Sequence, residues 1–529
     1  MRSVINQIVS QPPPPGRTMT FATLGGITSV PLADLYEQSG RLALGLRAAG
    51  AGAGDRIGIL AANRIEWVLL DLAALRLGAV TAGFEPAKFD PTPDLLDRYD
   101  LALLFTDMPM STDTPPSKDT PPAAQQGHLG VARTTAESPC YPGSTPAILP
   151  ISAVTDLIAT AQEDGELPPV EYGPRDVTTI KFTSGSTGTP KGLAATAGSI
   201  DASIGAVQQM FGHGPGDNIF VFLPLSLLQQ RYWVYSALAF GHDVTISTYE
   251  AAFAMMRRVE PTVVMGVPGF FETAKKHIES RAAGGDRRPA AERLFGPSIR
   301  YLWTGSAPAR ADVLRFFTDV GLPIYEGYGL NETCIVAKNH PGAHREGSVG
   351  QVLPGKKVLL DADGVVSVHS DNPVNTRYEY AAPGESERVF APDGTVRTGD
   401  LGYIDDDGFL FIRGRADDVI VLDNGKKVIV RPLEEFLKAS PAIEEAVVLC
   451  PTQTHLVAVV SPASDDADKG AIADRLAACN AAFTRDEQIK NLVIAAERFS
   501  IANGLLTSQF KPRRPQILKA YADQLAGSR

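Results

Sequence analysis

The sequence predicts an α/β protein with two units: a large N-terminal domain of layered sheets and helices, and a small C-terminal α/β domain. The chain has 529 residues, more than the ~100–200 of a typical single domain. Short apolar segments alternate with segments of helical periodicity, which is typical of layered α/β domains. After Asp400 short strands and acidic turns follow, then a small α/β pattern from Val419. We therefore expect domains at residues 1–414 and 415–529, joined at 414–417.

The spacing of apolar residues predicts the individual elements. Apolar residues recur at helical spacing over residues 32–49, and a glycine ends this expected helix. Residues 56–60 are typical of a short buried strand, and residues 65–77 of a helix that again ends at glycine. This strand and this helix, together with a strand expected after the glycine, predict a strand–helix–strand unit. Further strands are expected at residues 178–182, 218–222, 243–246, 263–265 and 300–303, with helices between most of them.

Residues 109–150 differ in composition from the segments around them. They contain nine prolines, interleaved with Ser, Thr, Gln and Asp. This composition cannot pack regularly, and it predicts a surface insertion or a mobile loop. A partner-binding Pro-rich segment is the alternative, although no clear polyproline ligand motif occurs.

Charge and cysteine usage exclude several classes of protein. The net charge of −11 leaves no overall positive field, so neither nucleic acid nor an anionic membrane is an expected partner. The apolar stretch at residues 67–82 is broken by charges and falls short of the ~20 residues of a membrane span. Four widely spaced cysteines predict reduced, buried thiols rather than a metal site or disulfides. No secretory leader is recognisable, and we expect a cytoplasmic protein.

The clearest functional signal is the loop TSGSTGTPKG at residues 183–192, which directly follows an apolar predicted strand. Glycines let a backbone approach a polyphosphate, and hydroxyl groups and exposed amides donate hydrogen bonds to it. Lysine adds a point charge. The spacing is not GxxxxGK[ST], which argues against a P-loop kinase or GTPase. We predict that the phosphates of ATP are bound by Thr183, Ser184, Gly185, Ser186, Thr187, Gly188 and Lys191.

This loop resembles the TSG[ST]TGxPKG signature of the AMP-forming adenylating superfamily, which includes acyl-CoA synthetases, firefly luciferase and peptide-synthetase adenylation domains. The resemblance extends in order from residues 42–68 to Lys511. The segments at 398–428 and 503–514 look most like the long-chain acyl-CoA synthetase and carboxylic acid reductase branches. The resemblance implies the acyl-adenylate-forming fold, with a mobile C-terminal domain. It also implies activation of an acid by ATP with release of pyrophosphate.

Residues 325–333, YEGYGLNET, are similar to the YGxTE segment of this superfamily. The similarity implies that Tyr328 stacks on adenine, with Gly329 beside it, and that Glu332 helps to hold magnesium. A carboxylate beside a triphosphate is repulsive unless a divalent cation lies between them, which supports that role. Asn331 stands where threonine is usual, and its amide can still hydrogen-bond a phosphate oxygen. A stretch resembling the family's adenine-pocket lining contains Gly305, Ser306 and Ala307.

The segment TGD at residues 398–400 matches the family's ribose-binding motif. The match implies that the carboxylate of Asp400 accepts hydrogen bonds from both ribose hydroxyls, which is the bidentate acceptor that a diol needs. Arg415 is implied to contact ribose or phosphate. Asp417 is implied to be the hinge about which the C-terminal domain rotates, and it coincides with the change in composition.

Lys511 stands at the position of the family's catalytic lysine. Its ammonium would stabilise the negative charge that develops between the attacking carboxylate and the α-phosphate. An ordinary basic tail is the alternative, because Arg513, Arg514 and Lys519 lie close in sequence. After the rotation, the strand that carries Gly425 is implied to face a thiol acceptor.

The expected acid pocket departs from the family pattern. Residues 223–226, LPLS, resemble a segment that continues with histidine, but Leu227 stands at that position. The pocket is therefore less polar than usual, which leaves the acid and the acceptor step open. The rest of the expected acid pocket is Gly266, Val267 and Pro268.

We predict an AMP-forming ligase that uses ATP and Mg²⁺, with Thr183 and Glu332 as metal ligands and Lys511, Glu332 and Lys191 as catalytic residues. Fatty or aryl acids are the expected substrates. The acceptor is expected to be diffusible, either coenzyme A or the phosphopantetheine of a separate carrier protein. One alternative is an atypical ligase, such as an ATP-dependent diazotase that activates nitrite for an aryl amine, or an amide-forming enzyme. Another is a non-catalytic nucleotide-binding protein.

Overall fold

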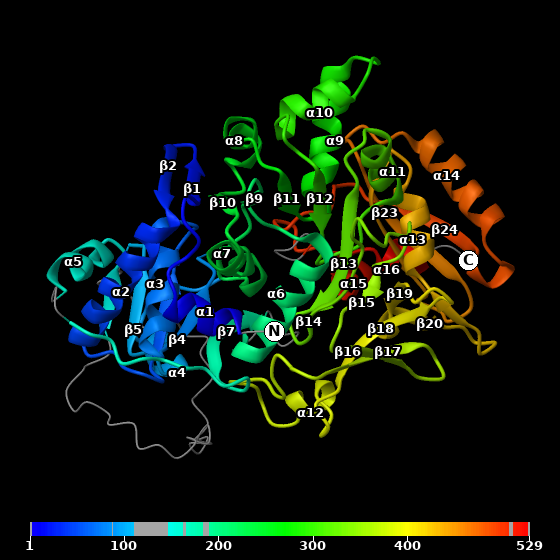
Figure 1. Cartoon of the computed structure of the whole chain (residues 1–529). Coiled ribbons are helices and arrows are strands. Elements are labelled where there is room, and N and C mark those ends of the chain that lie inside the picture. The colour runs from blue at the N-terminus through cyan, green and yellow to red at the C-terminus, as the bar shows by residue number, and fades with distance from the viewer. Residues whose placement is uncertain are drawn as a thin grey trace.

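The computed structural model describes residues 3–86, 88–109, 147–161, 165–183, 190–506 and 511–526. Helices and strands alternate along the chain and gather in layers (Figure 1), so the predicted α/β fold class is confirmed. Within these ranges no helix has both the length and the apolar character needed to cross a membrane.

The first sheet has six strands in the order β6-β5-β3-β4-β7-β8. Neighbouring strands are parallel except for the β7–β8 pair. The predicted strand–helix–strand unit is confirmed, because β3 and β4 pair in parallel and α3 connects them. The elements of this part are α2 (Leu32–Ala48), β3 (Arg56–Leu60), α3 (Ile65–Leu77), β4 (Val80–Phe84), α4 (Pro93–Tyr99), β5 (Leu103–Thr106), β6 (Ala147–Pro150), α5 (Ala153–Thr160), β7 (Val177–Thr183) and β8 (Lys191–Thr196).

The predicted insertion at residues 109–150 has the wrong C-terminal boundary. Residues 147–150 form strand β6, which pairs in parallel with β5 at the edge of the first sheet. The apolar residues of this short run can cover the sheet edge, and an edge strand tolerates the proline at its end. The remainder of the predicted insertion, residues 110–146, lies outside the described residues.

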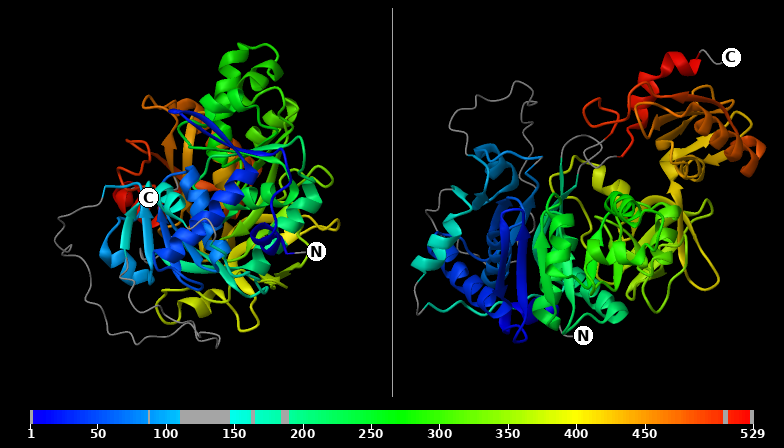
Figure 2. Two further views of the ribbon diagram at one scale, coloured as in Figure 1. Left: turned by 60° about the vertical axis from the view of Figure 1, so that its left-hand side comes forward. Right: turned by 90° about the horizontal axis from the view of Figure 1, so that it is seen from above.

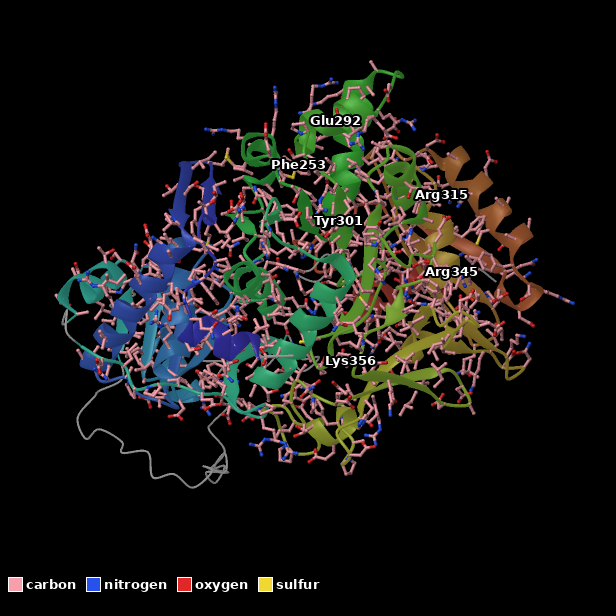
Figure 3. All side chains as sticks on the ribbon, viewed as in Figure 1. Phe253, Glu292, Tyr301, Arg315, Arg345 and Lys356 are labelled. Atoms are coloured by element: carbon pink, nitrogen blue, oxygen red, sulfur yellow. The ribbon has the colours of Figure 1, made fainter. Side chains whose placement is uncertain are left out.

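The second sheet has nine strands in the order β15-β14-β13-β12-β11-β9-β10-β1-β2. All the strands predicted between residues 218 and 303 are confirmed here, with boundaries shifted by one residue at most. Tyr301 on β12 lies near the centre of the molecule (Figure 3). The elements are α1 (Val4–Ser10), β1 (Thr18–Thr23), β2 (Gly26–Pro31), α6 (Ala197–Phe211), β9 (Asn218–Val221), α7 (Leu228–Phe240), β10 (Asp243–Ser247), α8 (Ala252–Val259), β11 (Val263–Gly266), α9 (Pro268–Ala282), α10 (Arg288–Phe295), β12 (Tyr301–Thr304), α11 (Ala311–Asp319), β13 (Ile324–Leu330), β14 (Cys334–Lys338) and β15 (Gln351–Val352).

A four-stranded antiparallel sheet, in the order β16-β17-β18-β19, follows and leads into the C-terminal part of the chain. Strands β22, β23 and β24 form a separate sheet, which gathers with α14 at one end of the molecule (Figure 2). The elements are β16 (Lys356–Leu360), β17 (Val365–Ser370), α12 (Glu385–Val389), β18 (Val396–Ile404), β19 (Leu410–Arg415), η1 (Ala416–Asp418), β20 (Val419–Val421), β21 (Lys427–Ile429), α13 (Arg431–Lys438), β22 (Ile443–Leu449), β23 (Leu456–Pro462), α14 (Lys469–Ala482), η2 (Arg485–Glu487), β24 (Ile489–Ile494), α15 (Arg514–Ala520) and α16 (Ala522–Ala526).

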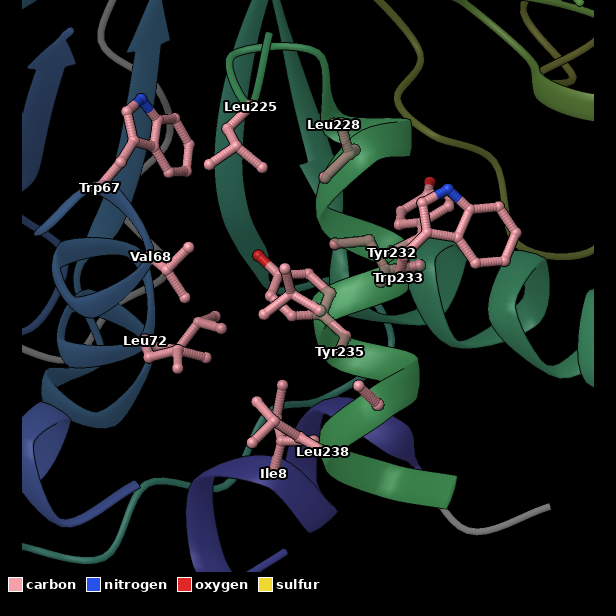
Figure 4. Packing of buried hydrophobic residues seen from close by; sticks show 14 of the residues in the cluster. Ile8, Trp67, Val68, Leu72, Leu225, Leu228, Tyr232, Trp233, Tyr235 and Leu238 are labelled. Carbon is pink, nitrogen blue, oxygen red and sulfur yellow. The ribbon is translucent and has the colours of Figure 1, made fainter. Parts of the chain in front are cut away.

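The first two sheets are joined through the apolar helices α3 and α7, whose facing side chains pack against each other (Figure 4). One buried polar network crosses this interface. Arg231 Nη1 donates to Asp71 Oδ1 at 2.8 Å, and the Tyr235 hydroxyl donates to Asp71 Oδ2 at 2.5 Å. Arg231 also donates to Thr179 Oγ1 at 2.8 Å. Because both charged side chains are almost inaccessible, the pair fixes how the two sheets meet.

Replacing Asp71 by alanine is expected to destabilise the protein by about 3–5 kcal/mol, since it leaves the Arg231 guanidinium buried without its counter-charge. The midpoint of denaturant unfolding measures this loss. The matched control is Glu346→Ala, which breaks an ion pair with Arg315 in which both side chains are 65% exposed. Its cost is expected to stay below about 0.5 kcal/mol. Equal costs for the two variants would contradict a structural role for the buried pair.

Candidate active site

The predicted binding segments gather at one edge of the second sheet. Strands β9, β11, β12 and β13 run parallel, so their carboxyl ends meet at the same edge. The expected acid pocket at 266–268 follows β11, and the expected adenine-pocket stretch at 305–307 follows β12. The segment that ends at Leu227 follows β9. Chain topology therefore brings three separate motifs to one place.

The two ends of the predicted phosphate loop are fixed by the first sheet. Thr183 ends β7 and Lys191 begins β8, and the two are direct partners in the antiparallel pair. Ser184, Gly185, Ser186, Thr187 and Gly188 lie outside the described residues. Gly192 is bridged to Glu379 by two backbone hydrogen bonds of 2.9 and 2.8 Å. A Cβ atom at Gly192 would lie 2.9 Å from the Tyr380 ring, so only glycine allows this crossing.

Lys191 and Glu332, predicted from motifs far apart in the sequence, meet through a residue that neither motif contains. The Tyr378 hydroxyl donates to Glu332 Oε1 at 2.7 Å, and Lys191 Nζ lies 5.0 Å from the centre of the Tyr378 ring. Lys191 Nζ also forms an ion pair of 3.0 Å with Glu385. Burial, followed by the charge of Glu332, raises the pKa of Tyr378, which therefore stays a hydrogen-bond donor. A cation and a carboxylate from two separate motifs thus contact the same tyrosine side chain.

A second group forms around Asp400, which is 7% exposed. The Tyr328 hydroxyl donates to Asp400 Oδ2 at 2.5 Å, and Arg415 Nη1 donates to Asp400 Oδ1 at 3.0 Å. Arg415 also donates to the carbonyl of Thr398 at 2.7 Å and lies 3.7 Å from Asp417. Each carboxylate oxygen can accept a further hydrogen bond, so two hydroxyl groups of a ribose can still be bound.

The backbone has special geometry at two of the predicted nucleotide-binding residues, Gly329 and Ser306. A Cβ atom at Gly329 would lie 1.8 Å from the carbonyl oxygen of Cys334, so this position needs glycine for the turn that precedes β14. Ser306 adopts a left-handed backbone with φ of 71°, which is uncommon for a residue other than glycine. Ser306, Ala307 and Asn331 are exposed, whereas Gly305 is half-buried.

Sequence reasoning missed Lys338, a fully buried lysine behind the expected adenine pocket. Its Nζ donates to the carbonyls of Tyr325 at 2.7 Å and Thr304 at 3.3 Å, and lies 3.6 Å from the centre of the Trp303 ring. Burial lowers the pKa of Lys338 well below its usual range, and burial raises the pKa of the nearby Glu326 to about 7. The lysine thus ties the last residue of β12 to the start of β13. Its sequence signal is weak, because Lys338 is the last residue of β14, where a charged side chain is usually exposed.

Two further lysines, also missed, lie behind Glu332. Lys356 Nζ donates to the carbonyl of Thr333 at 2.7 Å, and Lys181 Nζ lies 3.6 Å from Cys334 Sγ. Burial lowers the pKa of Lys356. Lys181 is 4% exposed and belongs to β7, which leads into the phosphate loop. Both side chains add positive electrostatic potential near the predicted phosphate-binding residues, and this potential would favour a bound phosphate chain.

The expected acid side is apolar where the structure describes it. Leu227 is half-buried and precedes the first residue of α7. Gly266 is packed so tightly that a Cβ atom there would lie 2.9 Å from the Phe271 ring. Val267 and Pro268 start helix α9.

The remaining predicted residues lie in the C-terminal part. Asp417 is in η1, the short helix between β19 and β20. Gly425 forms the turn of the β20–β21 hairpin with φ of 78°. Lys511 is exposed and precedes Pro512, which forms a single bridge with Leu506. The catalytic role of Lys511 stays a prediction.

Known sequences match both parts of the chain. The profile of the family described as AMP-binding enzyme matches residues 13–373, and that of the AMP-binding enzyme C-terminal domain matches residues 417–527. The long-chain-fatty-acid–CoA ligase FadD15 of Mycobacterium bovis is 29% identical over 94% of this chain and 92% of its own length. Human long-chain-fatty-acid–CoA ligase 1 is 24% identical over 89% of this chain and 77% of its own length.

Solved structures share the fold over nearly the whole chain. ATP-bound MatB from Rhodopseudomonas palustris has a TM-score of 0.75 at 22% identity, and the match covers 98% of this chain and 99% of MatB. The o-succinylbenzoate coenzyme A synthetase MenE from Bacillus subtilis, solved with ATP and magnesium ion, has a TM-score of 0.73 at 21% identity. That match covers 97% of this chain and 98% of MenE.

Proposed function

Because this chain belongs to the AMP-binding enzyme family, we propose that it activates a carboxylic acid with ATP and passes the acyl group to coenzyme A. It is an AMP-forming acid–thiol ligase. The carboxylate attacks the α-phosphate and pyrophosphate leaves. The thiol then attacks the acyl carbon of the adenylate, AMP leaves, and the thiol proton is released. The observation that carries this proposal is the contact of one tyrosine, Tyr378, with both Lys191 and Glu332.

On the nucleoside side, we propose that Asp400 holds the ribose and the Tyr328 ring lies against adenine. The hydrogen bonds from Tyr328 and Arg415 fix the carboxylate of Asp400 before the ribose arrives. A fixed acceptor loses little freedom on binding, which favours affinity. Gly305, Ser306 and Ala307 follow β12 and would form the opposite wall.

On the phosphate side, we propose that Lys191 exchanges Glu385 for the phosphates of ATP. The ion pair with Glu385 neutralises the lysine until ATP binds, and its ammonium lies over the ring of Tyr378, whose hydroxyl binds Glu332. A lysine in this position compensates the charge that develops on the phosphates during the attack. Thr183 and the loop residues 184–188 would contribute hydroxyl and amide donors.

We propose Mg²⁺ as the metal of this site, held by Glu332 and Thr183. Mg²⁺ is usually bound through one or two carboxylates, and substrate phosphates and water supply the other ligands. Glu332 fits this pattern, since Tyr378 occupies only one of its carboxylate oxygens. The described part of the chain has no cluster of three or more His, Cys, Asp or Glu side chains that could hold a metal. The ion would therefore enter with ATP and neutralise the charge of its phosphates.

We propose that Lys511 completes the site for the first step. The C-terminal domain, taken as residues 415–529, would then turn about Asp417 and bring Gly425 to the thiol. The exposure of Lys511 and of the β20–β21 turn supports this proposal, because neither segment is held in a buried core. A hinge needs only a few residues that absorb the backbone change.

The proposed substrate is a long-chain fatty acid. The names of the relatives support this class, and the leucine at position 227 makes the expected pocket less polar than histidine would. The phosphopantetheine of a separate carrier protein offers the same thiol chemistry as coenzyme A and is a second acceptor to test. The three cysteines that the structure describes are free thiols, as expected in a reducing compartment, and we propose a cytoplasmic location.

The proposal is tested by measuring release of AMP and pyrophosphate with panels of fatty and aryl acids, with and without coenzyme A. We expect pyrophosphate release that depends on a carboxylic acid and thioester formation that depends on coenzyme A. Nitrite with an aryl amine is the comparison substrate. Turnover with nitrite and none with any carboxylic acid would overturn the proposal.

Replacing Lys338 by methionine is expected to raise the KM for ATP about tenfold or more, with a smaller change in kcat. Methionine fills similar space but leaves the carbonyls of Tyr325 and Thr304 without their donor, which costs about 1–3 kcal/mol at the ends of two strands. Initial rates at varied ATP measure the effect. The control is Lys357→Met at an exposed position of β16. A lower melting temperature with an unchanged KM would show that Lys338 only stabilises the fold.

A further inference from the structure

A surface pocket lies on the helices α8, α9 and α10, outside the proposed active site. These helices pack together at one end of the molecule (Figure 1), where Figure 3 marks Phe253 on α8 and Glu292 on α10. The pocket has a volume of about 280 Å³. It is lined by Phe253, Ala254, Arg257, Arg281, Arg293 and Leu294. Each of the three helices thus contributes one arginine, and we call this site the arginine pocket.

The apolar wall of the arginine pocket is held in place by the protein core. The Phe253 ring stacks on Phe270 with centroids 4.4 Å apart and an angle of 6° between the ring planes. Its other contact is an edge-to-face one with His277 at 5.0 Å. Leu294 is 3% exposed. A ligand would therefore meet a rigid aromatic and aliphatic surface beside the three charges.

The three arginines of the pocket form no ion pair with any carboxylate that the structure describes. Two acidic side chains on the same helices are paired elsewhere, Glu279 with Lys275 at 3.2 Å and Glu292 with Arg288 at 2.8 Å. Residues 251–300 carry nine Lys or Arg against five Asp or Glu, although the whole chain has a net charge of −11. Three like charges around one pocket repel each other, and a bound anion would remove this cost.

We propose that the arginine pocket binds the phosphate group of a ligand that also carries an apolar body. The planar guanidinium fork suits two hydrogen bonds to phosphate, which a lysine cannot match. Phe253 and Leu294 would contact the apolar body. Arg281 is thirteen residues along α9 from Pro268, about 20 Å at the rise of a helix. The ligand is therefore distinct from the ATP of the active site.

A different explanation of these arginines is that each stabilises the end of its own helix. Arg257, Arg281 and Arg293 all lie in last turns, where a cation interacts favourably with the helix dipole. That effect requires a charge but no particular shape, and it does not require the three side chains to share a pocket. Lysine at these positions would preserve it, whereas phosphate binding would lose the guanidinium fork.

The test measures binding of three probes to the full-length protein: inorganic phosphate, coenzyme A, and vesicles of phosphatidylglycerol compared with phosphatidylcholine. The pocket variant carries Arg257→Gln, Arg281→Gln and Arg293→Gln. We expect its affinity for at least one probe to fall about tenfold or more, because charge-assisted hydrogen bonds are lost. A response of coenzyme A or of phosphatidylglycerol vesicles identifies the source of the phosphate as a soluble cofactor or a lipid headgroup. An equal response of inorganic phosphate alone would overturn the role given to the apolar wall. Pyrophosphate release with acid and ATP is expected to stay within about twofold of the original rate.

A variant with the same loss of charge is the matched control. It carries Arg258→Gln, Lys276→Gln and Arg287→Gln, three exposed residues of the same region that do not line the pocket. Its affinity for the responding probe is expected to change less than about twofold, because these side chains do not line the pocket and cannot hydrogen-bond a phosphate group bound there. Lys191→Ala should likewise keep this binding. The triple Arg→Lys pocket variant is expected to lose affinity while it keeps its melting temperature. An equal loss in the control, or no selective loss for any probe, would overturn the proposal.

Discussion

Replacing Lys511 by alanine is expected to lower the rate of acyl-adenylate formation by about two to three orders of magnitude. The loss of one preorganised donor aimed at developing charge typically costs about 3–4 kcal/mol of transition-state stabilisation. Thioester formation from acyl-adenylate supplied to the enzyme is expected to change less than about threefold, because the proposed domain rotation would withdraw the lysine after the first step. Pyrophosphate release without coenzyme A measures the first half-reaction. Thioester formed from synthetic acyl-adenylate and coenzyme A measures the second.

The control for Lys511 is Lys519→Ala, because both residues belong to the same basic stretch. Lys519 is exposed on α15, and its loss is expected to change either half-reaction less than about twofold. If both variants lost adenylation equally, the basic tail would act through its overall charge. Undiminished adenylation in the Lys511 variant would remove the proposed catalytic role. A loss in both half-reactions would argue against withdrawal of the lysine by a domain rotation.

The elements of the fold were largely predictable because local patterns determine them. Residues 65–77 form a helix as expected, and Gly78 ends it in the left-handed conformation that its position requires. The parallel strands of the second sheet are short apolar runs, and they were found for the same reason. Strand β6 was missed because its pairing with β5 is decided by a neighbour in space. The proline-rich composition of residues 109–150 predicted irregular structure there, although residues 147–149 are apolar.

Residues of the candidate site could be predicted only where they belong to a recognisable sequence motif. Glycine and hydroxyl spacing indicated the phosphate loop, and the TGD segment indicated Asp400. Tyr378 and Glu385 carry no such signal, since Tyr378 lies outside any regular helix or strand and Glu385 only begins the short helix α12. The backbone bridge between Gly192 and Glu379 brings them to Lys191. A contact of this kind depends on tertiary structure, and no spacing in the sequence encodes it.

Replacing Glu332 by glutamine is expected to lower kcat/KM for ATP by about two orders of magnitude or more, and to raise the Mg²⁺ concentration needed for half-maximal activity. Glutamine keeps an oxygen that can accept the hydrogen bond from Tyr378, so the side chain stays in place while its charge is lost. An uncharged amide is a much poorer ligand for a hard cation than a carboxylate. Adenylation at varied Mg²⁺ measures both effects, and partial rescue at high Mg²⁺ is expected.

Glu385→Gln is the matched control for this prediction, because it removes the carboxylate that forms an ion pair with Lys191. Glu385 has no proposed metal role, so its loss is expected to leave the Mg²⁺ requirement unchanged. It is also expected to lower the KM for ATP slightly, since Lys191 no longer has to exchange a protein partner for phosphate. A raised Mg²⁺ requirement in both variants would mean that the carboxylates act through the electrostatic potential around Lys191. An unchanged requirement in the Glu332 variant would contradict its role as a metal ligand, and Tyr378 would then only position Lys191.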